Sequence, residues 1–111
     1  MKASILTAMA LSFSSTVFAA DLNQNALATL LTSKNLSLSG DVHSDETLKS
    51  IYTSALNGGA KIENECVVTT AETAKCTLWF TYVIGETAVT YSVYLPGNKL
   101  VSNRLYVSRG D

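Results

Sequence analysis

The sequence is poor in the residues from which metal sites, redox centres and nucleic-acid surfaces are built. Its 111 residues include one histidine and two cysteines, and eight basic side chains stand against nine acidic ones. A single histidine is too few ligands for a metal centre. A charge this close to neutral gives no electrostatic attraction for nucleic acid or for an anionic membrane. Cys66 and Cys76 do not form a C-x-x-C motif, which disfavours catalytic redox chemistry.

The first twenty residues have the layout of a secretory signal. Lys2 precedes a mostly apolar stretch without acidic residues over 3–18, and Val17 and Ala19 are the small residues that a signal peptidase accepts before a cut at Ala20. Serine and threonine dilute this stretch, and it is shorter than the ~20 residues that a bilayer span needs, so a removable signal is favoured over an anchor helix. We predict a signal peptide over 1–19 and export to the bacterial periplasm or medium.

Removal of the signal leaves residues 20–111, which are 92 of the 111 residues and enough for one domain. Loss of Lys2 takes the formal net charge from −1 to about −2. In an oxidising compartment the two cysteines are expected to form a disulfide. No cofactor is expected, because neither a metal-ligand cluster nor a nucleotide-binding loop is present.

Apolar periodicity predicts two helices in the first half of the mature chain, with a short strand between them. Asp21 is the expected cap of the first helix, with Gln24 completing a capping box. Leu36 and Leu38 then alternate with serines in a short strand that ends at Gly40. The apolar positions of the first helix are Ala26, Leu27, Leu30 and Leu31.

The second helix has the clearer pattern. Ser44 or Asp45 is expected to cap it, and the Gly58-Gly59 pair supplies the left-handed turn at which helices end. Its apolar stripe consists of Leu48, Ile51, Tyr52, Ala55 and Leu56.

From residue 60 onward β-branched and aromatic residues predict strands. If the cysteines face each other, a hairpin tip falls at 70–72 and Ile62 lies opposite Phe80. A two-residue turn at Gly85-Glu86 would place Phe80 opposite Tyr91 and Leu78 opposite Val93. A last strand would place Leu105 beside Tyr91 and Val107 beside Val89. The predicted fold is therefore α+β, with two N-terminal helices packed on a four-stranded antiparallel meander that carries one disulfide within the sheet.

The opposite face of this meander holds the candidate partner-binding residues Trp79, Tyr94, Arg104 and Tyr106. Trp79 is expected between Glu63 and Ser92, with Tyr94 and Arg104 one diagonal step away. Tryptophan, tyrosine and arginine often anchor protein interfaces because each combines apolar area with a polar group. Two alternatives remain open: an ordinary solvated sheet surface, or a face covered by a helix with Trp79 in the core.

Candidates for catalysis are weaker. His43 has Asp41, Ser44, Asp45 and Glu46 nearby, but such residues are typical of a turn before a helix. Glu63 and Glu65 share a strand face, which is more often a solvated edge than a catalytic carboxylate pair.

Residues 36–69 resemble the strand-helix-strand half of a BON domain. The match consists of a Leu-x-Gly-x-Val strand end at 38–42, an acid-capped helix, a glycine and a second strand. The residues at comparable places are Leu38, Gly40, Val42, Glu46, Gly59, Ile62 and Asn64. The resemblance covers about a third of the chain and implies an envelope protein associated with outer-membrane lipid or surface maintenance.

Two functional hypotheses follow. The first is a small exported non-enzymatic binding protein of the bacterial envelope, for instance an inhibitor or immunity protein against a secreted or periplasmic hydrolase. The alternative is a BON-like envelope-maintenance module that binds lipid or envelope components. In the first hypothesis the partner is another protein of the envelope or medium, without nucleic acid or stable membrane insertion, and an exposed edge strand leaves a homodimer open.

Overall fold

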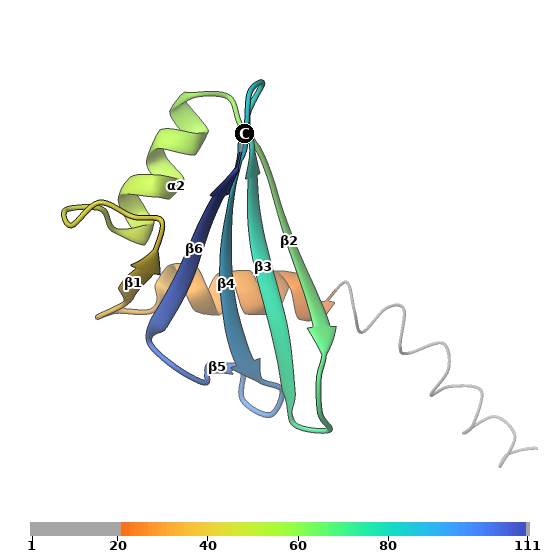
Figure 1. The fold of residues 1–111 in the computed structure, drawn as a ribbon. Coiled ribbons are helices and arrows are strands. Elements are labelled where there is room, and N and C mark those ends of the chain that lie inside the picture. Colours follow the sequence, from red (N-terminus) through yellow and green to blue (C-terminus); the bar gives the residue numbers. More distant parts are fainter. Residues whose placement is uncertain (1–20, 111) are drawn as a thin grey trace, which may run out of the picture.

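The computed structural model describes residues 21–110, so the signal predicted over 1–19 lies outside the described residues. A first helix runs through residues 21–32, followed by β1 (Ser37–Gly40) and α2 (Leu48–Asn57). Five more strands complete the chain: β2 (Lys61–Val68), β3 (Thr73–Thr81), β4 (Glu86–Tyr94), β5 (Lys99–Leu100) and β6 (Arg104–Gly110). The sheet has the order β1-β6-β4-β3-β2, and β5 pairs with β4 (Figure 1).

The α+β class is confirmed, but the predicted arrangement of two N-terminal helices on a four-stranded antiparallel meander is wrong. The sheet is six-stranded and mixed, because β1, the short strand predicted between the helices, joins it and β5 adds a further strand. β1 pairs in parallel with β6, with Ser37 opposite Arg104 and Gly40 opposite Val107. A parallel pair needs a long crossover. This pairing joins the first and last strands of the domain, and no local pattern in the sequence predicts it.

The end of α2 is as predicted and its start is not. Thr47 caps the helix instead of Ser44 or Asp45: its hydroxyl accepts from the N–H of Ser50, and the Ser50 hydroxyl accepts from the N–H of Thr47. At the other end the chain turns through Gly59, with φ of +72°. In the first helix, Asp21 is itself helical, so it is not the cap that the sequence predicted.

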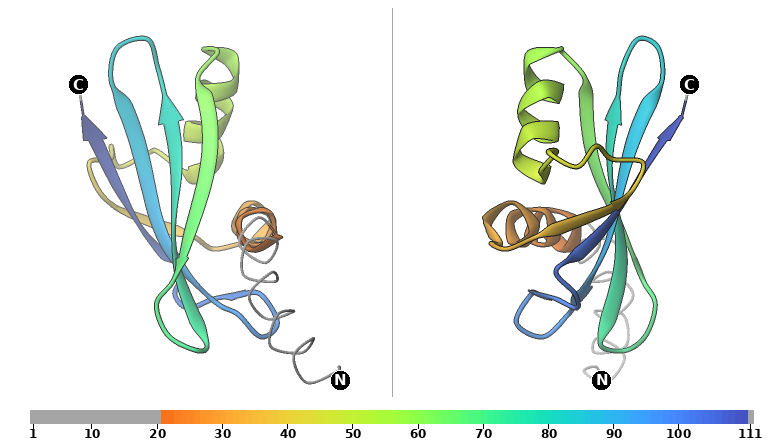
Figure 2. Two further views of the ribbon diagram at one scale, coloured as in Figure 1. Left: turned by 90° about the vertical axis from the view of Figure 1, so that its right-hand side faces the viewer. Right: turned by 60° about the vertical axis from the view of Figure 1, so that its left-hand side comes forward.

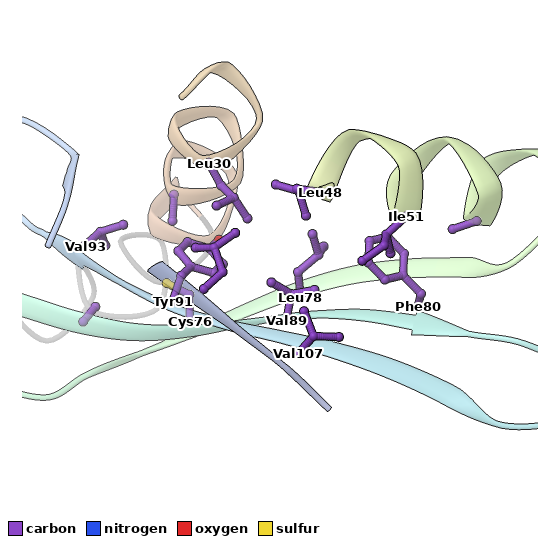
Figure 3. Packing of buried hydrophobic residues seen from close by; sticks show 14 of the residues in the cluster. Leu30, Leu48, Ile51, Cys76, Leu78, Phe80, Val89, Tyr91, Val93 and Val107 are labelled. Carbon is purple, nitrogen blue, oxygen red and sulfur yellow. The ribbon is translucent and has the colours of Figure 1, made fainter. Parts of the chain in front are cut away.

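The hydrophobic core lies between the helices and one face of the sheet, which we call the inner face (Figure 3). Phe80 on β3 is fully buried, and its ring meets that of the partly buried Tyr52 edge-on at 5.9 Å between centroids. Both helices contribute to this one core. Its other buried members include Leu22, Ala26, Leu30, Leu48, Ile51, Ala55, Leu78, Val89, Tyr91, Leu105 and Val107.

The pairing of β2 with β3 is as predicted, since Cys66 faces Cys76 and Ile62 faces Phe80. The pairing of β4 with β6 also agrees at Val89 and Val107.

The predicted pairing of β3 with β4 is wrong. Phe80 lies opposite Thr87, and Cys76 rather than Phe80 lies opposite Tyr91. The connecting loop is 82–85 instead of a two-residue turn at 85–86, and the pairing is displaced by four residues. Because the displacement is even, every side chain keeps its predicted face.

A polar network ties the first helix to the free edge of the sheet. The side-chain oxygen of Asn23 accepts from the backbone N–H of Cys66 at 2.8 Å, and the Asn64 amide donates to the Asn23 carbonyl at 2.9 Å. The hydroxyl of the buried Tyr91 donates to the Asn64 side chain at 2.8 Å. Burial raises the pKa of Tyr91, so this hydroxyl stays a donor. The helix thereby occupies a backbone group of the edge strand β2 that would otherwise be free to pair.

Candidate partner-binding surface

The face of the sheet opposite the core, which we call the outer face, is not covered by either helix of the described chain (Figure 2). The interpretation in which a helix covers this face is therefore wrong for residues 21–110. Threonine, serine and charged side chains dominate it, together with three aromatic side chains. Its residues include Glu63, Glu65, Thr77, Trp79, Thr81, Thr90, Ser92, Tyr94, Arg104 and Tyr106.

Trp79 lies on the outer face two residues before the end of β3 and is partly buried. It faces Glu63 on β2, as predicted, but its neighbour on β4 is Ala88 instead of Ser92. The small Ala88 leaves a shallow hollow of about 210 Å³ beside the indole, bordered also by Ser108 and Gly110. The ring therefore has an open side toward solvent.

Arg104 and Tyr106 lie together on β6, two residues apart and on the same face. Both border a hollow of about 280 Å³, together with Ser92, Ser102 and Thr90. The Ser102 hydroxyl accepts from the backbone N–H of Arg104 at 3.1 Å and holds the turn that enters β6. Tyr106 is 55% exposed, and the Arg104 guanidinium forms no ion pair within residues 21–110. This pair offers a flat ring and an unneutralised charge side by side.

The structure places Tyr94 far from Trp79 along the sheet. Tyr94 lies opposite Thr73 at the far end of β4, six residues along the ladder from the level of Trp79. At about 3.3 Å per residue the two aromatic side chains start about 20 Å apart. The predicted diagonal contact of Trp79 with Tyr94 and Arg104 is thus absent, because it depended on the displaced pairing of β3 with β4.

The disulfide between Cys66 and Cys76 is confirmed, with the two Cα atoms 4.0 Å apart in directly opposed residues. The carboxylates of Glu63 and Glu65 are exposed on the outer face, and Glu63 lies 3.8 Å from Lys61. Within residues 21–110 no three potential metal ligands gather in one place. No described helix is both long and apolar enough to cross a membrane.

The turn around His43 holds a strong ion pair instead of an acid-base pair. Arg109 on β6 donates to both Glu46 oxygens at 2.9 and 2.8 Å, and to the carbonyl of Asp41. The Glu46 carboxylate also accepts from the backbone N–H of His43, whose side chain is exposed. The hydrogen bonds from Arg109, then from His43, lower the pKa of Glu46 to about 2. These contacts hold the turn against β6, because both oxygens of Glu46 accept hydrogen bonds from Arg109.

Two apolar features did not emerge from the sequence patterns. Val83 and Ile84 at the tip of the β3–β4 hairpin are almost wholly exposed. A groove lined by Leu30, Leu31, Leu36 and other residues opens between the first helix and α2. The displaced turn is the reason for the exposure of Val83 and Ile84, because the expected two-residue turn at 85–86 would have placed Ile84 opposite Thr87 in the sheet.

Comparison of the chain with protein-family models, with curated proteins and with solved structures finds no significant match.

Proposed function

We propose that this protein is a small exported binding protein of the bacterial envelope, without enzymatic activity, which holds a partner protein on the outer face of its sheet. An inhibitor or immunity protein against a secreted or periplasmic hydrolase is the form of this proposal that we favour. The disulfide supports an oxidising compartment, because such bonds persist mainly outside the cytosol.

The observation that carries the proposal is the pairing of Arg104 with Tyr106 on an uncovered sheet face. Aromatic and arginine side chains that border a hollow are the commonest anchors of protein interfaces. β6 is held in the sheet by pairing on both edges, with β1 and with β4, so these side chains project from a rigid surface. A rigid surface loses little conformational entropy on binding. The partner expected from the free guanidinium is one with a carboxylate at the centre of its contact surface.

The test is capture of envelope proteins of the source bacterium by the immobilised mature protein, followed by binding measurements with each captured protein. Arg104→Ala and Tyr106→Ala should each weaken binding by more than about 30-fold, the loss typical of an interface anchor. Glu63→Ala is the matched control, because it removes an exposed side chain from the same face on the edge strand β2, which β3 and β4 separate from β6. If all three variants weaken binding of the partner equally, or if none weakens it, binding at this site is contradicted.

Inhibition is tested separately with the captured protein or with purified peptidoglycan hydrolases and proteases. The expected result is loss of hydrolase activity at equimolar protein and its recovery with Arg104→Ala. Turnover of any hydrolase substrate by the protein alone would contradict a non-enzymatic role.

The alternative function is the BON-like envelope module that binds lipid or other envelope components. The residues that carry the resemblance fold as β1, α2 and β2, the strand-helix-strand order that the family shows. Co-sedimentation with vesicles of outer-membrane phospholipid would favour this alternative, and binding unchanged in Arg104→Ala would separate it from the first proposal.

A further inference from the structure

The loop between β3 and β4 lies at one end of the sheet (Figure 1). It presents two aliphatic side chains to solvent. Val83 and Ile84 are 103% and 84% exposed, the largest values among the large apolar residues of the described chain. The loop is closed by a hydrogen bond from the N–H of Tyr82 to the carbonyl of Gly85 at 3.0 Å, and Gly85 has φ of +88°. We call Val83 and Ile84 the apolar tip.

The tip is carried by a rigid support. β3 and β4 pair over nine residues each, from Thr73 opposite Tyr94 to Thr81 opposite Glu86. Side chains held in this way cannot fold back onto the domain, so their exposure to water persists unless another molecule covers them. Exposed adjacent aliphatic side chains at a rigid protrusion are typical of contact sites.

A groove that is also mainly apolar lies elsewhere on the molecule. It opens between the first helix and α2, and its volume of about 480 Å³ is within the range of ligand-binding pockets. Its lining is mainly aliphatic and aromatic, and the charged residue among the lining side chains is Lys49. We call it the helical groove; its lining includes Leu30, Leu31, Leu36, Leu48, Lys49 and Tyr52.

The charges beside the two features are opposite. Glu86 is exposed at the base of the apolar tip, and Lys49 is exposed at the helical groove. We propose that the apolar tip of one copy of this protein inserts into the helical groove of a second copy. The contact joins two different surfaces, so each copy keeps one free tip and one free groove, and further copies add head to tail.

Other occupants fit the tip less well. A single myristoyl chain binds bilayers only marginally, and Val83 with Ile84 presents about half as many carbons, so the tip is too small to hold the domain at a membrane. Pairing of two copies through the edge strand β2 is opposed by Asn23, which already occupies the N–H of Cys66. Antiparallel pairing centred on Asn64 would also place Glu63 beside Glu65 of the other copy.

The test is sedimentation of the mature protein across roughly 10 µM to 1 mM, because two side chains and one charge pair make a small, weak interface. We expect the average mass to rise with concentration. The tip variant V83S/I84S and the groove variant K49E/T53W should each stay monomeric, with association at least tenfold weaker. All four positions are exposed, so the fold is expected to survive, which circular dichroism checks.

Mixing the two variants gives the decisive result. The tip variant keeps its groove and the groove variant keeps its tip, so an equimolar mixture should form a dimer and nothing larger. Val67→Ser removes an exposed aliphatic side chain from β2 and should leave association unchanged. A wild-type protein that stays monomeric, association that survives in either variant, or variants that fail to combine on mixing would each overturn the proposal. None of these outcomes depends on binding by Arg104 and Tyr106.

Discussion

Replacement of Phe80 by alanine is the most direct measure of how the helices are held on the sheet. The ring is fully buried, lies opposite Ile62 and Thr87 in the sheet and meets Tyr52 of α2 edge-on. Loss of a buried phenylalanine costs about 3–5 kcal/mol, from lost transfer free energy and the cavity left behind. The Tyr52 contact accounts for about 0.5–1.5 kcal/mol of this through its edge-to-face geometry.

Urea unfolding followed by far-UV circular dichroism and by Trp79 fluorescence measures this loss as a change in midpoint at constant slope. The matched control is Thr81→Ala, the next residue of β3, whose side chain is exposed on the outer face and whose loss should change stability by less than about 0.5 kcal/mol. A loss below about 1 kcal/mol for Phe80→Ala, or equal losses for both variants, would refute the assignment of inner and outer faces.

The remaining predictions concern the three constraints that hold the strands and turns. Changing both cysteines to alanine should lower stability by about 3 kcal/mol, measured by urea unfolding, and reduction of the wild type should raise its intact mass by two hydrogens. Because folding lowers the pKa of Glu46 from 4.5 to about 2, its pair with Arg109 stabilises the protein above pH 4.5 and is lost as the pH falls toward 2. The pair is partly exposed, so we expect about 1–2 kcal/mol, and Glu46→Gln should abolish this acid dependence in urea midpoints measured at several pH values. Gly40→Ala should cost more than about 2 kcal/mol in thermal or urea unfolding, because φ is +91° and a Cβ atom would collide with the backbone of β6, whereas Gly97→Ala, also at positive φ but in open space, should cost less.

Local patterns predicted most of the elements and both faces of the sheet. The period of the apolar residues depends only on neighbours within one turn or one strand, so α2, the edge strand β2 and the last strand were recognisable without tertiary information. The opposed cysteines added a long-range constraint that the sequence itself contains, and the pairing of β2 with β3 was therefore correct.

The candidate site was predicted only in part. The outer-face position of Trp79, Arg104 and Tyr106 follows from alternation, which survives any even displacement of a strand. Which of them lie together depends on the length of the turn between β3 and β4, and a glycine at 85 is compatible with both a two-residue and a four-residue connection. The four-residue connection that forms separates Tyr94 from Trp79 and leaves Val83 and Ile84 unpaired at the tip.

Side-chain contacts favour the observed pairing of β3 with β4. In the observed arrangement Tyr91 lies beside Cys76, where its hydroxyl reaches Asn64, and Phe80 is free to meet Tyr52. Had Phe80 and Tyr91 been opposed, the hydroxyl would have lost this partner in the core. The observed pairing therefore depends on contacts between non-neighbouring strands and between α2 and the sheet, which the pattern of a single strand does not contain.

The sequence by itself determined the class of the domain, the period and faces of its elements and the disulfide, because each depends on neighbouring residues or on the two cysteines alone. Only the tertiary structure decided that β1 pairs with β6 and that Arg109 meets Glu46. In both contacts residues more than sixty positions apart are brought together. Such contacts stabilise the protein only after the intervening chain has folded. The local sequence of either segment therefore does not predict them.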